Sequence, residues 1–354
     1  MRIARSLPAT LGLSLLAISS AVTGIAQRSA TPAGTAVQSS ATAKIVSAAQ
    51  ALMNSLDDAG KAKLQFPFDG PQKTRWSNLP SPMFKREGIR VGDLTPAQRA
   101  AVTALLTAAL SADGFRKVTE IMRGDEVLRT GQAGRGRGGA GGGPAFGLDE
   151  YYVAFLGAPS TTSPWMLQFG GHHLAINLTI AGAQSSLTPS LPAAQPATYT
   201  WEGREIRPLG KENDKAFALV NALDASQRSQ AILTYRVADL VLGPGQDGKT
   251  IQPEGLRASA LSAAQQTMLL DLVREWTGIV TDSFAEPRIA DIRAHLPDTY
   301  FAWSGPTTNG SPAYFRIQGP TLVIEYAPQG GSVDHIHTIY RDPTNDYGAK
   351  FVGK

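Results

Sequence analysis

The chain has 354 residues, no cysteine and a formal net charge of +4. The lack of cysteine excludes disulfides, thiolate metal sites and cysteine nucleophiles, so any metal ligand must come from His, Asp, Glu or backbone oxygen. The nearly balanced charge gives no support for nucleic-acid binding, which requires a clustered basic surface.

The N-terminal segment predicts export. Arg2 and Arg5 precede a mostly apolar run that extends to Ile25, and Gly24 and Ala26 supply the small residues that a signal peptidase requires before the cleavage point. This arrangement is typical of a signal peptide, so we expect residues 1–26 to be removed and the mature protein to be periplasmic or extracellular. A membrane anchor is the competing interpretation, but the run is short and contains three serines and a threonine. We therefore expect no membrane span in the mature chain.

The next segments predict a leader followed by helices. Residues 27–42 are rich in Ala, Ser, Thr and Gly and predict a flexible leader, and residues 43–354 are expected to form a single domain. From Ala43 to Leu56 the apolar residues recur at helical spacing, and Gly60 ends the pattern.

A helix-start pattern then occurs three times, at Leu94–Gln98, Leu223–Gln227 and Leu261–Gln265. Each copy has a capping residue after a leucine and a glutamine three positions later, which is a capping box, so a helix is predicted after each. The spacings between the copies are unequal, which favours shared helix-start chemistry over a solenoid repeat.

A glycine-rich segment spans residues 131–147. A phosphate-binding loop would need a Lys-Ser/Thr pair and a strand-to-helix frame, and neither is present. The composition predicts a surface loop.

Strand-like segments are frequent from residue 151 onward, and they predict the fold class. Residues 151–156 and 165–180 are rich in aromatic and β-branched types, and four more segments occur at 300–303, 313–318, 322–326 and 335–340. Short connectors with Asn309-Gly310, Gly319-Pro320 and Gly330-Gly331 permit only antiparallel neighbours among the last four. We therefore predict an α+β fold with an antiparallel β-meander in the C-terminal third and helices packed from the N-terminal and middle segments.

All five histidines lie at or beyond position 172, and four of them form two close pairs. His335 and His337 lie two residues apart on a predicted strand, so both project from one face. His172 and His173 are consecutive and should point to opposite faces of a regular strand, unless Gly170-Gly171 introduces a bulge. Glu325, on the preceding strand, faces either His337 or the opposite side, depending on the register.

These residues predict a metal site. The candidate ligands are His172, His173, His335, His337 and Glu325, a nitrogen-and-oxygen set suited to a divalent transition metal such as zinc, iron, copper or nickel. His173 and Glu325 are also the candidate catalytic groups. Asp334 is a candidate for orienting a histidine from outside the ligand set.

The predicted function is a metal-dependent enzyme, hydrolytic or oxidative, acting on a small molecule that the sequence does not identify. One alternative is a non-catalytic periplasmic or envelope protein whose histidines bind a ligand or only pack. A further alternative is metal-free catalysis, in which a histidine activates water beside Glu325.

Several segments together resemble a known family. They are Trp165–Asn177, Gly319-Pro320 with Ile324–Tyr326, the tail His335–Gly348, the helix start Leu94–Gln98, and Trp76. The chain resembles the bacterial family known as domain of unknown function 3500 over most of its length from about residue 45. That family has no assigned activity, so the resemblance marks positions and implies no roles.

Overall fold

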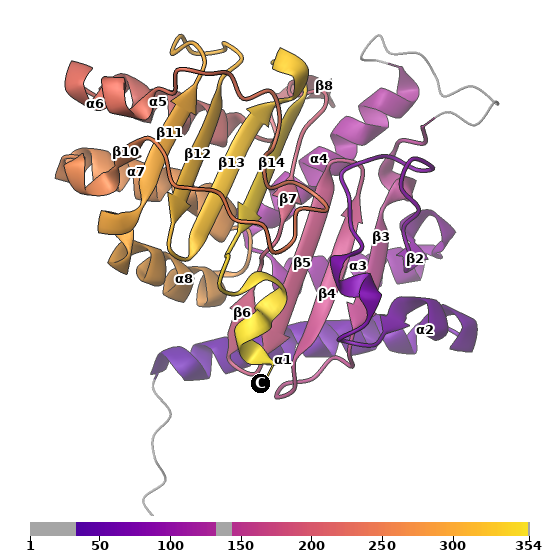
Figure 1. Ribbon diagram of the computed structural model, residues 1–354. Helices are drawn as coiled ribbons and strands as arrows, with labels where there is room; N and C mark the ends of the chain where they lie inside the picture. Colours follow the sequence, from indigo (N-terminus) through magenta and orange to yellow (C-terminus); the bar gives the residue numbers. More distant parts are fainter. Residues whose placement is uncertain (1–32, 132–143, 353–354) are drawn as a thin grey trace, which may run out of the picture. The chain divides into compact units, whose positions relative to one another are not determined.

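Two β-sheets lie edge to edge in the computed structural model, which describes residues 33–131 and 144–352 (Figure 1). The first sheet contains β1 (Gln65–Phe66), β2 (Ile89–Arg90), β3 (Tyr152–Leu156), β4 (Trp165–Gly171), β5 (Leu174–Ala181), β6 (Gln184–Ser186) and β7 (Leu191–Pro192). The second contains, in spatial order, β10 (Leu256–Arg257), β11 (Tyr300–Ser304), β12 (Tyr314–Gly319), β13 (Leu322–Pro328) and β14 (Ile336–Arg341), each antiparallel to its neighbour. A separate hairpin pairs β8 (Tyr199–Trp201) with β9 (Arg204–Ile206).

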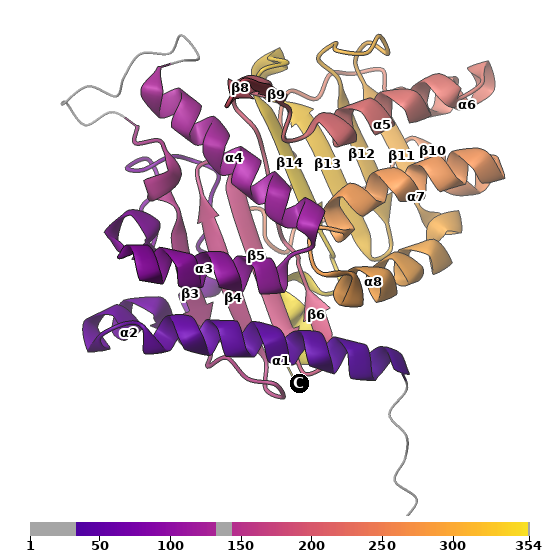
Figure 2. The ribbon, with the colours of Figure 1, turned by 180° about the vertical axis from the view of Figure 1, so that it is seen from behind.

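The helices cover one face of the two sheets (Figure 2). They are α1 (Ala33–Asn54), α2 (Asp58–Leu64), α3 (Pro96–Ala109), α4 (Ala112–Thr130), α5 (Gly210–Ala222), α6 (Ala225–Ala231), α7 (Ala263–Thr277) and α8 (Asp282–Ala294). The main apolar core lies between these helices and the sheets, as expected for two packed layers. None of the described helices is long and apolar enough to cross a membrane.

The predicted fold class is confirmed. The chain is α+β, and its last four strands form the predicted antiparallel meander. All three predicted capping boxes are present, and they start α3, α6 and α7 through the side chains of Thr95, Asp224 and Ser262.

The predicted leader is wrong where the structure describes it, because α1 begins at Ala33 and residues 33–42 are helical. Its remaining part, residues 27–32, lies outside the described residues, as does the predicted signal peptide. Most of the glycine-rich segment, residues 132–143, also lies outside them.

Most of the described chain forms two equivalent halves. The order helix, helix, crossing segment, strand, helix, helix and three antiparallel strands runs from α1 to β5 and again from α5 to β13; the first half has one additional strand, β1, before its crossing segment. In the first part of each half the sequences also correspond: Ala51–Asp57 (ALMNSLD) matches Ala218–Asp224 (ALVNALD), and Leu94–Gln98 matches Leu261–Gln265 at the same offset along the chain. The recurring helix-start pattern therefore belongs to an internal duplication.

Equivalent hydrogen bonds support this correspondence. Gln98 Nε2 donates to the carbonyl of Ser55 at 2.9 Å, and Gln265 Nε2 donates to the carbonyl of Ala222 at 2.8 Å. The pairing of β2 with β3 also has the same register as that of β10 with β11, with Arg90 opposite Tyr152 and Arg257 opposite Tyr300.

Each half has a long segment that crosses the sheet face opposite the helices (Figure 1). We call residues 67–88 the first crossing loop and residues 234–255 the second crossing loop. They have equal length and occupy equivalent places, the first between β1 and β2 and the second before β10.

The two sheets meet at β7 and β14. Ser190 and Ala194 form antiparallel bridges with Tyr340 and Ile336, so the two edges are joined by backbone hydrogen bonds. This seam places the start of β14 close to the β4–β5 turn of the first half.

Candidate metal centre

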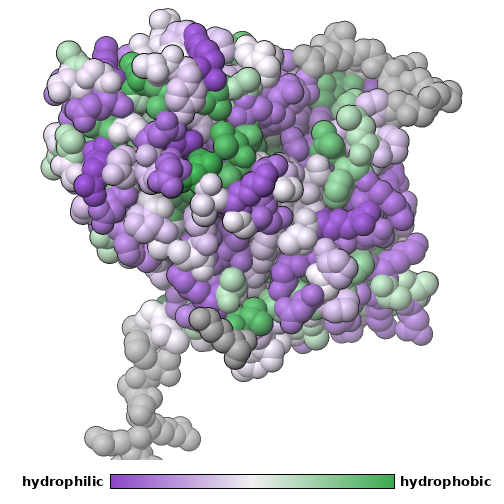
Figure 3. Space-filling model, viewed as in Figure 1, coloured by the Kyte–Doolittle hydropathy of each residue, from purple (hydrophilic) through white to green (hydrophobic). Residues whose placement is uncertain are grey.

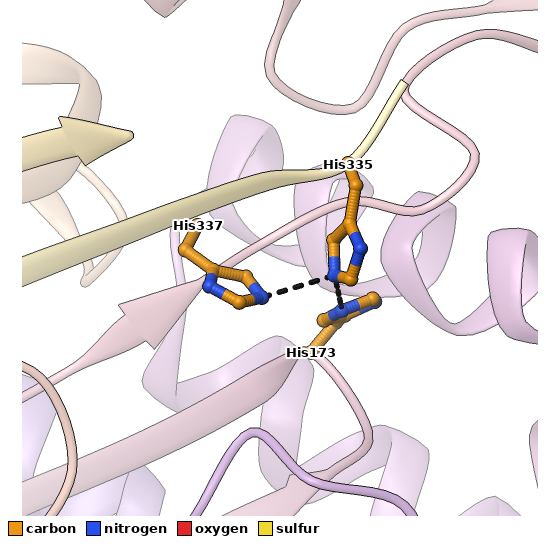
Figure 4. Close-up of side chains that lie close together, drawn as sticks. All are labelled: His173, His335 and His337. Carbon is orange, nitrogen blue, oxygen red and sulfur yellow. Dashed lines mark hydrogen bonds between the residues drawn. The ribbon is translucent and has the colours of Figure 1, made fainter. Parts of the chain in front are cut away.

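Three imidazole rings converge at the seam between the two halves (Figure 4). The Nε2 of His335 lies 2.8 Å from the Nε2 of His173 and 3.0 Å from the Nε2 of His337. One ligand atom from each ring lies within 4.8 Å of the others. Two nitrogens bound to one zinc ion at 2.0–2.1 Å would be roughly 2.9–3.4 Å apart for angles between 90° and the tetrahedral value. The separations of the His335 nitrogen from the other two rings are therefore close to those of ligands around one ion.

The β4–β5 turn places His173. Gly171 pairs with Leu174, so His172 and His173 are the two residues of a tight hairpin turn. The sequence-based prediction that they lie on a strand is therefore wrong. His173 has a φ of 62°, which is unusual for a residue other than glycine. Because of this turn, the two rings do not point to opposite faces; they lie against each other, tilted by 30°, with their centroids 3.7 Å apart.

Backbone hydrogen bonds set the distance between His173 and β14. The N–H of Ala193 donates to the carbonyl of His173 at 2.9 Å, and Ala194 exchanges two backbone hydrogen bonds with Ile336, each 2.9 Å long. His337 lies within β14, as predicted, whereas His335, which was also predicted to be part of this strand, immediately precedes it. A short stretch of backbone thus connects the turn of one half with the histidine strand of the other.

The electrostatics favour the neutral form of the His173 imidazole. Burial, together with the neighbouring rings of His172, His337 and His335, holds the pKa of His173 well below its ordinary value. His173 is 3% exposed and His337 is 6% exposed, whereas His335 is half-buried. Solvent therefore reaches the cluster from the side of His335, and the neutral form is the one that binds a metal.

Asp239 orients one of the rings. Its Oδ1 lies 2.9 Å from the Nδ1 of His337, so the Nδ1 carries the proton and the Nε2 presents its lone pair to the other rings. Burial alone would raise the pKa of Asp239, but the hydrogen bond with His337 lowers it below its ordinary value. This carboxylate comes from the second crossing loop, so both halves contribute to the site.

His172 lies beside the cluster but outside it. Its Nδ1 is 2.5 Å from the Oδ1 of Asp125, a residue of α4 that is 2% exposed. Burial raises the pKa of Asp125, and the hydrogen bond from His172 opposes that rise. Phe146 packs against the other side of the His172 ring, with the centroids 4.9 Å apart. His172 is therefore placed to support the ring of His173 and not to share an ion with it.

Glu325 also lies outside the cluster. The register of β13 and β14 puts it on the same face as His337, but its carboxylate accepts hydrogen bonds from the backbone N–H groups of Val241 and Leu242 and from the hydroxyl of Tyr314, at 3.0, 2.7 and 2.7 Å. It is 0% exposed. Its oxygens hold the second crossing loop on the sheet, which is a structural role and not the predicted ligand or catalytic role.

Sequence reasoning missed the two acids that orient histidines. Asp334, the predicted candidate, instead accepts a hydrogen bond from the backbone N–H of Ala197. Asp239 and Asp125 lie far from the histidines in the sequence, one in an irregular loop and the other in a helix, so no spacing pattern connects them with the histidines.

The face that carries the site is partly apolar (Figure 3). Among the described residues, the exposed large apolar side chains on the crossing loops are Leu79 and Met83 in the first and Tyr235 and Val241 in the second. The same loops contribute polar contacts to the histidines, through Asn78 and Asp239.

A comparison with protein families matches residues 38–349 to the family described as a protein of unknown function, DUF3500. The chain belongs to this family. Comparisons with curated proteins and with solved structures found no match. The predicted resemblance is thus confirmed. Because DUF3500 has no assigned activity, a function for this member has to be inferred from its own residues.

Proposed function

We propose that His173, His335 and His337 bind one divalent transition metal ion and that the protein is a metal-dependent enzyme. The observation that carries this proposal is the convergence of three buried or half-buried imidazole nitrogens within 4.8 Å. When each ring carries its proton on Nδ1, the three Nε2 lone pairs face one another, and a cation at their centre removes the repulsion between them.

The ligand set favours hydrolytic over oxidative chemistry. A site of three histidines leaves the ion its full positive charge and an open position, and a divalent ion held in this way polarises a carbonyl or lowers the pKa of a bound water. The set formed by two histidines and one carboxylate, typical of non-haem iron oxygenases, would require Glu325 at the ion. The Glu325 carboxylate is instead occupied by two backbone N–H groups and a tyrosine hydroxyl. Zinc is therefore the preferred ion.

Other residues of the chain would assist. Asp239 would keep the Nε2 of His337 unprotonated, and the adjacent ring of His172 would hold His173 in its unusual backbone conformation. His335, the most accessible of the three, borders the side from which a substrate would enter.

The proposal is tested by metal analysis of purified, chelator-treated protein after exposure to Zn²⁺. We expect one tightly bound zinc ion per chain, measured by elemental analysis and titration calorimetry, and its loss in a His335→Ala, His337→Ala double variant. His295→Ala is the matched control, because His295 lies at the end of α8 and its ring contacts only Asp291 among the described residues.

The hydrolytic part is tested separately with p-nitrophenyl esters and phosphates. We expect turnover that requires zinc and disappears in the double variant but not in the control. Protein that binds no transition metal would overturn the metal site, and bound zinc without turnover of any probe would favour the non-catalytic binding protein.

A further inference from the structure

Asn78 contacts two of the three histidines of the cluster. Its side-chain Nδ2 lies 3.2 Å from the Nε2 of His337, and its backbone carbonyl accepts a hydrogen bond from the N–H of His173 at 3.2 Å. Its side-chain oxygen has no hydrogen bond among the described residues. Asn78 belongs to the first crossing loop, so its position depends on how that loop is held.

Arg86 holds the backbone on both sides of Asn78. Its guanidinium donates to the carbonyl of Ser77 at 2.8 Å, to that of Leu79 at 2.6 Å and to that of Gly171, in the strand that leads to the histidine turn, at 2.8 Å. Arg86 forms no ion pair among the described residues and uses its hydrogen bonds on carbonyl groups. The loop and the turn are therefore joined by one side chain, which places Asn78 at the cluster.

The polar atoms around His337 are crowded. The Nδ1 of His337 faces the carboxylate of Asp239 and carries the proton, so its Nε2 has a single lone pair. Both the Asn78 Nδ2 and the His335 Nε2, at 3.2 and 3.0 Å, approach that lone pair. One lone pair accepts one good hydrogen bond, so these two polar atoms compete for the same acceptor, whereas a cation placed among them could be shared by the His337 and His335 nitrogens.

A half-turn of the amide exchanges its nitrogen and oxygen. The Asn78 Oδ1 would then occupy the place of the Nδ2, 3.2 Å from the Nε2 of His337. That separation lies within the roughly 2.9–3.4 Å expected for neighbouring ligands of an ion bound at 2.0–2.1 Å.

We propose that Asn78 is a fourth protein ligand, bound to the metal ion through its side-chain carbonyl oxygen. This inference rests on the proposed metal site and deepens it, because it changes the ligand set from three imidazoles to three imidazoles and one amide oxygen. All four ligands are neutral, so the ion keeps its charge, and water or substrate would occupy a fifth coordination position.

The test uses Co²⁺ and Zn²⁺ as probes on the full chain after removal of metal. We expect Asn78→Ala to weaken binding of both ions by about ten-fold or more in titration calorimetry, a loss at least as large as that for a group outside the ligand set. We also expect the visible absorption of the Co²⁺ form to become more intense, because d–d bands strengthen as the coordination number falls. Asn78→Asp should bind more tightly than the wild type at neutral pH, since a carboxylate adds a negative charge at the same place.

Leu79→Ala is the matched control, because its side chain is 41% exposed and it neighbours Asn78 in the same loop. It should change neither affinity nor spectrum. Equal Co²⁺ affinity and equal spectra for the wild type and Asn78→Ala would overturn the role of Asn78 and leave the three-histidine site standing. Wild-type protein that binds neither ion would overturn both proposals. Thermal unfolding of the metal-free variants shows whether Asn78→Ala fails to fold. If it does, Asn78→Asp becomes the deciding variant, and a failure of that variant to bind Co²⁺ and Zn²⁺ more tightly than the wild type overturns the proposal.

Discussion

Replacing Glu325 tests whether its carboxylate is a structural group or a metal ligand. Glu325→Ala removes the acceptor of three hydrogen bonds, two from backbone N–H groups of the second crossing loop and one from the hydroxyl of Tyr314. Each buried donor left without a partner costs about 1–3 kcal/mol. Part of the loop can take up water, because Val241 is 38% exposed, so we expect the free energy of unfolding to fall by about 3–6 kcal/mol. Burial and the adjacent carboxylate raise the pKa of Tyr314 well above its ordinary value, so its hydroxyl remains a donor throughout the accessible pH range.

Urea denaturation of the metal-free protein measures this loss, and zinc titration measures the second property. We expect Glu325→Ala to keep one zinc site per chain, with reduced affinity at most, because the loop it releases carries Asp239. Glu286→Ala is the control: that carboxylate also bonds an arginine, Arg274, but the two side chains are 55% and 42% exposed, so we expect a change below about 1 kcal/mol. The reasoning is refuted if Glu325→Ala unfolds at the same urea concentration as the wild type while its zinc site is lost.

Three further predictions concern the contacts of α4 with the second half and the metal site. Lys117 and Glu212 form a buried ion pair between α4 and α5. Lys117→Met should lower the free energy of unfolding by about 3–5 kcal/mol in urea denaturation, and adding Glu212→Leu should recover most of that loss. An equal loss in the single and the double variant would contradict this prediction. Gly114→Ala would put a methyl group 2.0 Å from the backbone carbonyl oxygen of Ile279, just before α8. We expect the free energy of unfolding to fall by about 3 kcal/mol or more in urea denaturation. A variant as stable as the wild type would contradict this prediction. Asp239→Ala should weaken zinc binding by about 10–100-fold in calorimetry without changing the stoichiometry, and unchanged affinity would show that it does not orient His337.

The C-terminal meander could be predicted because its information is local. Alternating apolar residues define each strand, and glycine-containing connectors are too short for anything but antiparallel pairing. The register is not local. It is set by packing on both faces, so the position of Glu325 relative to His337 could be stated only as two alternatives, and the interactions of its carboxylate with a loop some eighty positions away were not foreseeable from the strand.

The turn at His172 and His173 shows a different limit. Residues 165–180 form one nearly continuous apolar and β-branched run, and the turn falls on two histidines and not on the glycines before them. A left-handed backbone at His173 is uncommon for that residue type, so turn chemistry alone would not find it. The side chains that position the cluster, Asp239, Asp125 and Asn78, come from other segments and follow no shared periodicity.

The duplication was hidden for a simple reason. The partner of the capping box at Leu223–Gln227 is Leu56–Gly60, where Asp57 caps the backbone N–H of Gly60 and no glutamine is available to return the hydrogen bond. The counterpart of the second copy therefore lacks the capping-box pattern, which leaves three copies at unequal spacings along the chain. The shared ALxNxLD sequence is short enough to be missed without the structural equivalence of α1 with α5.

The duplication also explains why the cluster lies at the seam and occurs once among the described residues. Each half uses a polar pair across its central strands to hold its crossing loop, Gln168 with Asn177 in the first and Arg316 with Glu325 in the second. These pairs are equivalent, so the counterpart of Glu325 is Asn177, a residue of the polar pair that holds the first crossing loop and not a metal ligand. The hairpin turns, in contrast, differ: the first carries His172-His173 and the second carries Pro320-Thr321.

Only the first turn faces the start of β14, whose histidines have no counterpart at the equivalent place in the first half. A site composed in this way needs both halves in contact, because His173 and Asn78 come from one and His335, His337 and Asp239 from the other. An ion bound there would link the two halves across the hydrogen bonds of β7 and β14, so its binding free energy would add to the stability of the seam as well as supply chemistry.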